Sequence, residues 1–351
     1  MNSNWWRGKR VFLTGHTGFK GSWLSLWLQN AGAEVHGYST PPPTEPNLFT
    51  MGRIAKGLAS HTVADVRDAD ALKAAMHAAT PEVVLHMAAQ PLVRRSYAAP
   101  VETYSVNVLG TVHLLEAARE CRNLRVLVNV TTDKCYDNKE HVWGYREDEA
   151  MGGLDPYSSS KACSELITAA YRASYFKSGG TAVATARAGN VIGGGDWASD
   201  RLIPDAVRAW QAGRVLAIRN PSAIRPWQHV LEPLAAYLRL AERLWDTPAL
   251  AGAYNFGPDT ADAASVGDVV ALARQTYGTG EWESLADPKA PHEAGWLALE
   301  VAKARVALDV RARWPLQEGI RRTMHWYRRC ADGADARSLC DADIADFEGA
   351  R

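Results

Sequence analysis

The sequence predicts an α/β protein, built from a doubly wound parallel sheet and a smaller, irregular α/β lobe. Three observations lead to this fold class. A glycine-rich turn follows the first apolar segment, short apolar segments then alternate with longer helical ones, and this alternation loosens after Gly189. Strands that alternate with helices form parallel sheets with helices on both faces.

The first elements form a strand–helix–strand unit. Residues 11–13 are a short apolar run that ends at Thr14-Gly15, and 34–38 form a second strand after Gly32. Consecutive parallel strands require a crossover helix between them. Residues 22–29 supply it, since their large apolar residues share one helical face: Trp23, Leu24, Trp27 and Leu28.

The same alternation continues along the chain. Strands are predicted at 83–85, 126–130 and 183–187, and helices at 101–121 and 157–176. This order predicts a Rossmann-type arrangement, in which ligands bind outside the carboxyl ends of the strands.

Two domains are expected. Residues 1–188, with 222–256 returning to them, form the Rossmann-type domain, and residues 189–221 and 257–351 form the substrate-binding lobe. Small ligands favour the crevice between two such lobes.

Composition and charge argue against several classes of protein. The 351 residues carry 39 Lys and Arg against 39 Asp and Glu, so no excess charge favours nucleic acid or an anionic membrane as a partner. No apolar run approaches the roughly 18 residues of a membrane helix. The five cysteines form no CxxC pair, which argues against a disulfide framework or a metal site and favours a cytoplasmic protein.

The glycine-rich turn predicts a dinucleotide site. The segment 14–21, TGHTGFKG, lies between a strand and a helix. Its glycines permit a tight turn and close approach of the backbone to a pyrophosphate, which the helix N-terminus faces. The alternative is a glycine-rich turn without a ligand. The candidate cofactor residues of this segment are Gly15, Thr17, Gly18, Phe19 and Gly21.

The end of the second strand leaves the choice between NAD and NADP open. An acidic residue there commonly binds the ribose hydroxyls. Residues 37–40 contain neither such an acid nor an arginine for a 2′-phosphate. Asp65 and Val66, after a third strand, are expected at the adenine edge, although a solvated loop aspartate fits the sequence equally well.

Five polar residues form the candidate catalytic set. Tyr157 and Lys161 are four residues apart on a predicted helix and therefore share a face. A nearby ammonium favours the phenolate, which makes the tyrosine a base for an alcohol proton. Thr132, Asp133 and Lys134 follow a strand and add a hydroxyl, an acid and an amine at the same edge of the sheet. A capped loop is the alternative for Asp133 and Lys134.

Several strings resemble one known group of enzymes. The glycine motif, Asn107, Thr132 and the Tyr157–Lys161 pair are similar to the extended short-chain dehydrogenases that act on nucleotide sugars. Weaker similarity runs to about residue 330. Five strings resemble, more narrowly, the CDP-glucose branch of the 4,6-dehydratases: GHTGFKGSW at 15–23, HMAAQPLVR at 86–94, TDKCYDN at 132–138, RAGNVIGGGDW at 187–197 and RPWQHVLEPL at 225–234.

The resemblance implies a lyase that uses NAD and CDP-glucose. It implies oxidation at C4 of the sugar with Tyr157 as the base, loss of water across C5 and C6 with Asp133 as the acid, and hydride return to C6. Lys134 stands where related dehydratases carry glutamate, and its role as the C5 base is a hypothesis. The resemblance assigns Ala88, Ala89 and Asn107 to the cofactor, and Asn190, Arg225, Asn255 and His292 to the nucleotide diphosphate.

The resemblance also implies an assembly and a pathway. Helices like 101–121 and 157–176 form a homodimer contact in the family, alone or in a dimer of dimers. The product resembles a precursor of dideoxy sugars in bacterial surface polysaccharides such as the lipopolysaccharide O-antigen. Two alternatives stay open: a nucleotide-sugar 4-epimerase of the same fold, which Asp133-Lys134 disfavours, and a non-catalytic dinucleotide-binding protein.

Overall fold

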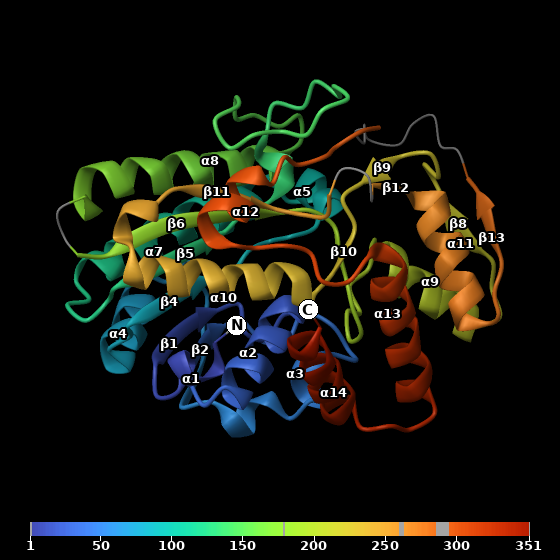
Figure 1. The fold of residues 1–351 in the computed structure, drawn as a ribbon, viewed down its shortest axis with the longest axis horizontal. Helices are drawn as coiled ribbons and strands as arrows, with labels where there is room; N and C mark the ends of the chain where they lie inside the picture. The colour runs from blue at the N-terminus through green and yellow to red at the C-terminus, as the bar shows by residue number, and fades with distance from the viewer. Residues whose placement is uncertain (1, 178–179, 260–262, 286–294, 351) are drawn as a thin grey trace.

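A seven-stranded parallel sheet forms the centre of the molecule. The computed structural model describes residues 2–177, 180–259, 263–285 and 295–350. The strand order is β11-β6-β5-β4-β1-β2-β3 (Figure 1), which confirms the predicted doubly wound fold. The strands are β1 (Arg10–Thr14), β2 (Glu34–Ser39), β3 (Ser60–Val63), β4 (Val83–His86), β5 (Val126–Val130), β6 (Ala182–Ala188) and β11 (Ala253–Phe256).

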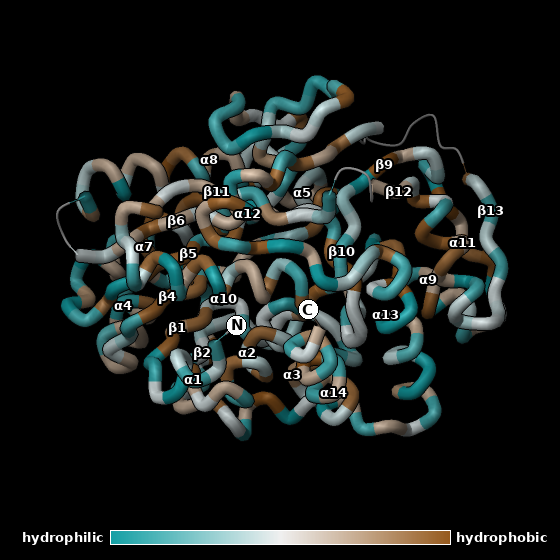
Figure 2. Tube along the Cα trace, in the orientation of Figure 1, coloured by the Kyte–Doolittle hydropathy of each residue, from teal (hydrophilic) through white to brown (hydrophobic). Residues whose placement is uncertain are grey.

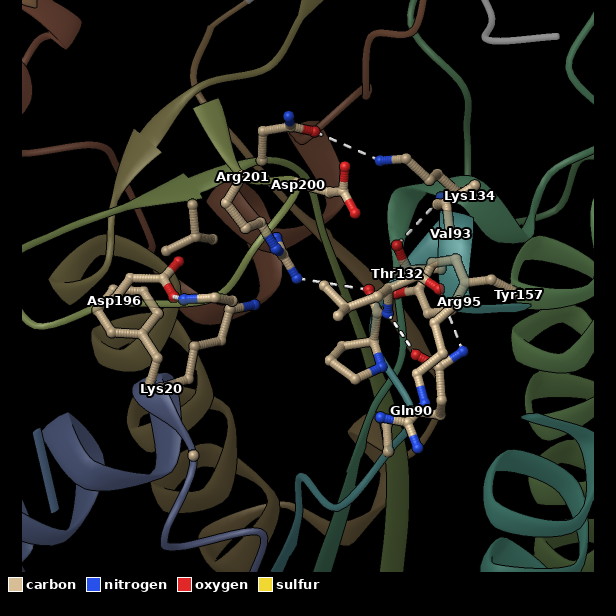
Figure 3. Close-up of a pocket in the computed structure, with 18 of the residues that line it drawn as sticks. Lys20, Gln90, Val93, Arg95, Thr132, Lys134, Tyr157, Asp196, Asp200 and Arg201 are labelled. Carbon is tan, nitrogen blue, oxygen red and sulfur yellow. Dashed lines mark hydrogen bonds between the residues drawn. The ribbon is translucent and has the colours of Figure 1, made fainter. Parts of the chain in front are cut away.

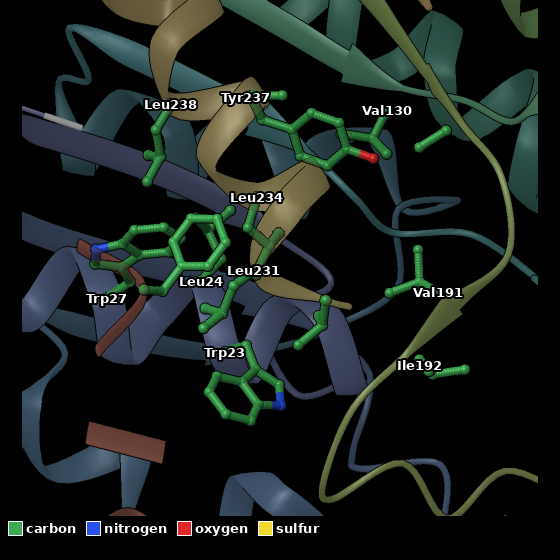
Figure 4. Packing of buried hydrophobic residues seen from close by; sticks show 14 of the residues in the cluster. Trp23, Leu24, Trp27, Val130, Val191, Ile192, Leu231, Leu234, Tyr237 and Leu238 are labelled. Carbon is green, nitrogen blue, oxygen red and sulfur yellow. The ribbon is translucent and has the colours of Figure 1, made fainter. Parts of the chain in front are cut away.

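Helices cover both faces of this sheet. Alternate strand residues point to opposite faces, so Val11 and Leu13 of β1 enter one core and Phe12 enters the other. The first core packs against α2 (Phe19–Asn30) and α10 (Leu231–Asp246), and Figure 4 shows Trp23 and Leu231 within it. The helices of the second core are α4 (Ala69–Ala79), α7 (Gly110–Arg119) and α8 (Pro156–Tyr171).

The two long predicted helices are confirmed, with a local change of winding in each. A π-helical turn, η2 (Ser105–Leu109), joins α6 (Pro100–Tyr104) to α7, and a second, η4 (Arg172–Phe176), ends α8. The start of α8 follows from local chemistry: the Asp155 side chain accepts a hydrogen bond from Ser158 N, and Pro156 occupies the first helical position.

The smaller lobe lies beyond the carboxyl ends of the sheet strands, on the right in Figure 1. Its short strands pair as β8 (Leu216–Ile218) with β13 (Trp282–Ser284) and β9 (Ile224–Arg225) with β12 (Ala264–Ser265). A further pair, β7 (Val191–Ile192) with β10 (Gln228–His229), lies between the lobe and the sheet. The lobe's helices are α9 (Leu202–Gln211), α11 (Val266–Tyr277) and α13 (Leu316–Ala331).

The last helix, α14 (Ala336–Gly349), packs against the Rossmann-type part of the chain. The Trp27 indole of α2 donates to Glu348 Oε1 at 2.8 Å, and its ring lies 5.7 Å from that of Phe347. The expected domain division places 257–351 in the smaller lobe. In the structure α14 contacts α2 beside the sheet and also α13 of the smaller lobe, where Arg322 pairs with Asp343 at 3.1 Å. The remaining helices are α1 (Ser3–Trp6), α3 (Leu48–Met51), α5 (Val93–Ala98), α12 (Ala302–Leu308) and the 3-10 turns η1 (Ile54–Gly57), η3 (Asp133–Cys135) and η5 (Pro248–Leu250).

The apolar residues gather around the sheet. Figure 2 shows hydrophobic segments along β1, β4 and β5, whose residues are almost all buried, and hydrophilic segments at the periphery. None of the helices in the described part of the chain is both long and apolar enough to cross a membrane.

Candidate functional site

A cavity of about 1080 Å³ opens at the carboxyl ends of the parallel strands. Its walls come from the turn after β1, the segments after β3, β4 and β5, the start of α8 and the smaller lobe. This volume is at the upper end of the range found for pockets that bind drug-sized ligands. It therefore has room for an extended ligand or for two ligands together.

The turn after β1 has the backbone shape of a dinucleotide cradle. Gly15 has φ +76°, and a Cβ atom there would lie 2.7 Å from Ala88 N. A Cβ atom at Gly21 would lie 2.1 Å from Gly15 O, so neither position accepts a side chain. The turn leads directly into α2, whose first amides face the cavity and fit a pyrophosphate.

The neighbouring strand end is tied to this turn. Thr14 Oγ1 accepts hydrogen bonds from Met87 N and Ala88 N, both at 3.1 Å, so Ala88 and Ala89 line the cavity beside the glycines. Thr17 also lines the cavity, although its hydroxyl is within hydrogen-bond distance of Thr40 O at 2.9 Å.

Asp65 and Val66 form the far wall of the same cavity. The Arg67 guanidinium donates to both carboxylate oxygens of Asp65, at 3.0 and 2.7 Å, and this pairing lowers the pKa of Asp65. Asp65 therefore places a negative charge in the cavity wall, where it can accept hydrogen bonds from polar groups of a ligand.

Thr132, Asp133 and Lys134 follow β5, and the Asp133 side chain faces inward. Asp133 is 1% exposed, and its Oδ1 accepts hydrogen bonds from Thr132 Oγ1 at 3.0 Å and Lys134 Nζ at 3.4 Å. Its Oδ2 is buried without a partner among the described residues. A buried carboxyl oxygen without a partner is costly unless a ligand group completes it.

Tyr157 and Lys161 reach the cavity from the first turns of α8. The Lys161 ammonium donates to Val130 O at 3.2 Å. Burial raises the pKa of Tyr157 to about 12, against the lowering effects of Thr132 and Arg201, and burial lowers the pKa of Lys161 to about 8. Burial thus outweighs the neighbouring groups of the protein and favours the neutral phenol, whereas the predicted phenolate depends on a positive nicotinamide as well as on the ammonium.

The cavity brings together most of the residues predicted for it. Arg225 and Asn190 line it, and Asn190 Oδ1 accepts a hydrogen bond from Lys134 Nζ at 3.3 Å (Figure 3). The members found in its walls are Gly15, Thr17, Gly18, Phe19, Gly21, Asp65, Val66, Ala88, Ala89, Thr132, Asp133, Lys134, Tyr157, Lys161, Asn190 and Arg225.

Asn107 and Asn255 do not line it. The Asn107 amide donates to Gln90 O at 3.1 Å and accepts from Gln90 N at 2.9 Å, so it fixes the loop after β4 from behind. The Asn255 amide accepts from Tyr136 Oη and donates to Tyr145 O, so its polar groups are used inside the protein. His292 lies outside the described residues.

Several cationic residues line the cavity that the sequence did not predict, and two of them are Lys20 and Arg201. Lys20 follows Phe19 within the glycine motif, and Arg201 immediately precedes α9. A lysine inside a phosphate-binding motif is a local signal that could have identified Lys20. No local pattern marks Arg201, because only the packing of the smaller lobe brings it to the cavity.

The set can accept and supply protons around one ligand. An acid with a free oxygen, a phenol and an amine lie on adjoining walls, which is the arrangement needed for proton transfer at a bound alcohol.

The chain is similar to nucleotide-sugar dehydratases over its whole length. Residues 12–329 match the family model described as GDP-mannose 4,6 dehydratase. A CDP-glucose 4,6-dehydratase of Salmonella typhimurium is 48% identical over 356 residues, which cover 100% of this chain and 99% of the relative. A dTDP-glucose 4,6-dehydratase of Streptomyces antibioticus is 32% identical over 269 residues, 75% of each chain.

Solved structures share the fold at lower identity. A UDP-glucose-4-epimerase from Stenotrophomonas maltophila has a TM-score of 0.80 at 21% identity and covers 92% of this chain and 99% of its own. A dTDP-glucose 4,6-dehydratase from Bacillus anthracis has a TM-score of 0.77 at 22% identity and covers 94% and 99%. At these identities the two structures support the fold alone.

Proposed function

The chain belongs to the family of nucleotide-sugar 4,6-dehydratases matched by the GDP-mannose 4,6 dehydratase model, and on that premise we propose that it converts CDP-glucose to CDP-4-keto-6-deoxyglucose with NAD. The substrate follows from the relative that is 48% identical over the whole chain. The observation that carries the dehydration step is the inward-facing Asp133 carboxyl beside Tyr157, because removal of a hydroxyl requires an acid.

The glycine turn, Ala88, Ala89 and the Asp65 wall are the residues that hold the dinucleotide. Their backbone approaches a pyrophosphate without steric hindrance, which supports the assignment. Bound there, NAD would supply an acceptor and then a donor of hydride for the sugar, and its positive ring would favour a tyrosine anion nearby.

Tyr157 is the base for the C4 hydroxyl proton. Burial alone would leave the phenol protonated, and the hydrogen bond with Thr132 opposes that effect. Lys161, which lines the same cavity one helical turn away, is proposed to supply an ammonium that stabilises the anion. Water exclusion strengthens both contacts once the ligand fills the cavity.

Asp133 is the acid for the C6 hydroxyl, and Lys134 is the base for the C5 proton. The unpartnered Oδ2 of Asp133 is free to donate to a ligand oxygen, while Oδ1 is held by Thr132. Lys134 Nζ contacts Asp133 at 3.4 Å and Asn190 at 3.3 Å, which places the amine next to the proposed acid.

Asn190 and Arg225 are the residues of the predicted diphosphate set that the cavity contains. Arginine binds phosphate oxygens through paired, charge-assisted hydrogen bonds. Because Asn255 is hydrogen-bonded inside the protein, we leave it out of the proposed substrate site.

One assay tests this function. The purified chain is incubated with CDP-, dTDP-, GDP- and UDP-glucose in parallel, with NAD added and withheld. A 4-keto-6-deoxy product that absorbs in alkali, formed fastest from CDP-glucose, is expected. CDP-galactose as the product would mean an epimerase, and no turnover of any sugar would leave a non-catalytic dinucleotide-binding protein.

We also propose that the enzyme acts in the cytoplasm as a homodimer and serves deoxysugar synthesis for a surface polysaccharide such as the O-antigen. The dimer is supported by exposed apolar side chains on α6, η2 and α8, which lie side by side: Val101 at 81%, Leu109 at 51% and Leu166 at 58% exposure. Exposed apolar groups of this kind mark protein contacts.

A further inference from the structure

Two cationic side chains enter the cavity from different parts of the chain. Lys20 lies in the first turn of α2, and Arg201 lies at the start of α9 in the smaller lobe. Figure 3 shows both side chains reaching into the space in front of Tyr157. They therefore come from the two lobes and meet in the crevice between them.

Neither cation is neutralised within the described residues. Lys20 makes no hydrogen bond or ion pair there, and Arg201 donates to the Pro91 carbonyl oxygen at 3.4 Å. The Asp196 carboxylate in the same wall accepts a hydrogen bond from Ala198 N at 3.1 Å and forms an ion pair with neither cation. No carboxylate of the described residues thus forms a close ion pair with either cation, and Asp196 and Asp133 act on Arg201 and Lys20 only at longer range.

The positive charges of Lys20 and Arg201 also repel each other. Burial, together with the positive charges of Arg201, Lys161 and Lys134, lowers the pKa of Lys20 to about 7 against the opposing effect of Asp133. Bringing like charges together in a partly dry cavity is unfavourable, and a bound anion would reverse that cost.

We propose that Lys20 and Arg201, one from each lobe, form a clamp that binds a diphosphate group in the crevice. This inference rests on the proposed function, because the nucleotide sugar and the dinucleotide each carry a diphosphate. A diphosphate fits better than a single carboxylate, since it offers oxygens to an ammonium and to a guanidinium fork at the same time. The clamp is an addition to the backbone amides of the glycine turn.

Ligand binding to the intact chain tests the clamp and identifies the diphosphate. Isothermal titration calorimetry with CDP and, separately, with NAD is carried out on the parent chain and on Lys20→Met, Arg201→Met and the double variant. Loss of a charge-assisted contact weakens binding by about 10- to 100-fold. The double variant is expected to lose less than the product of the single effects, because the two residues hold one group.

The titrations with CDP and with NAD show which of the two ligands supplies the diphosphate. Weaker CDP binding with unchanged NAD binding assigns the clamp to the substrate, and the reverse assigns it to the cofactor. Lys20→Arg, which keeps the charge, is expected to restore most of the affinity. Unchanged binding of both ligands in the methionine variants overturns the inference.

A matched control distinguishes a local clamp from general cavity charge. Lys139 also lines the cavity, but its ammonium pairs with Asp137 at 2.8 Å, so Lys139→Met is expected to bind both ligands as the parent does. Thermal melting of each variant checks that it folds. A parent chain that binds CDP but does not dehydrate CDP-glucose overturns the proposed function and leaves the clamp intact.

Discussion

At the scale of single residues, a substitution of Asp133 tests the acid step apart from the rest of the reaction. Asp133→Asn keeps an Oδ1 acceptor for Thr132 but has no acidic proton. We expect the rate of product formation to fall by about 10²- to 10⁴-fold, the usual contribution of a positioned acid. In D₂O, CDP-glucose recovered from this variant should carry deuterium at C5, because the C5 base is still present.

The control for this substitution is Asp137→Asn, which removes an exposed carboxylate that is paired with Lys139. It should turn over CDP-glucose at the parent rate. Full activity of Asp133→Asn would exclude the carboxyl as the acid.

Deuterium incorporation at C5 also tests the proposed role of Lys134 as the C5 base. Lys134→Ala removes the amine that lies 3.4 Å from Asp133 Oδ1, and we expect both dehydration and C5 deuterium incorporation to be lost together. Mass spectrometry of the recovered sugar measures the incorporation. If the variant dehydrates normally and incorporates deuterium fully, another group removes the C5 proton.

Most of the candidate site could be predicted from the sequence at this scale, and the failures have a physical cause. The glycine turn and the residues after β5 belong to local motifs, so their position at the strand ends follows from the chain itself. Asn255 also lies near a strand end, but its side chain is buried inside the protein. Position near a strand end does not determine to which face of the sheet a side chain points. The raised pKa of Tyr157 depends on burial by segments that are distant in the sequence, so the residues around Tyr157 do not predict it.

At the scale of elements, α10 is anchored through a buried carboxyl group. Glu232, in its first turn, accepts hydrogen bonds from Arg313 N at 3.0 Å and Trp314 N at 2.7 Å. Burial raises the pKa of Glu232 to about 7, against these hydrogen bonds. The folded chain therefore keeps a proton that the unfolded chain releases, and stability is lost as pH rises from the usual glutamate pKa of about 4.3 through 7.

Glu232→Gln removes this titration while retaining an acceptor oxygen. Relative to the parent, its free energy of unfolding is expected to be about 2 kcal/mol higher at pH 8 than at pH 5. Urea unfolding at the two pH values measures the difference. Glu283→Gln, an exposed position on β13, serves as the control. A difference that does not change with pH would mean that Glu232 is ionised throughout in the folded chain.

The long elements were predictable because each carries its own pattern, whereas the short ones depend on distant partners. Buried runs such as Val126–Val130 identify strands without knowledge of their neighbours. The two-residue strands β7 and β10 exist only because residues 191–192 meet residues 228–229. The partner of α14 was also unpredictable, since an amphipathic helix does not specify which surface covers it.

At the scale of the whole molecule, the surface of α6, η2 and α8 predicts the oligomeric state. The apolar side chains exposed there, Val101, Leu109 and Leu166, belong to helices that contact one another. In the proposed dimer, Leu166→Arg would place a charge within the contact between the subunits. A buried, unpaired charge costs several kcal/mol, enough to raise the dimer dissociation constant by more than about 100-fold.

Sedimentation equilibrium measures this outcome directly. The parent chain is expected at twice its mass of 38.3 kDa, or a multiple of that, and Leu166→Arg at a single chain mass. Val306→Arg is the matched control, because Val306 is 85% exposed on α12 and lies outside this face. A parent chain that sediments as a monomer, or a Leu166→Arg variant with unchanged mass, would contradict dimerisation through α8. Because the cavity opens at the strand ends and this face lies on the helices beside the sheet, a monomeric Leu166→Arg variant should still bind CDP.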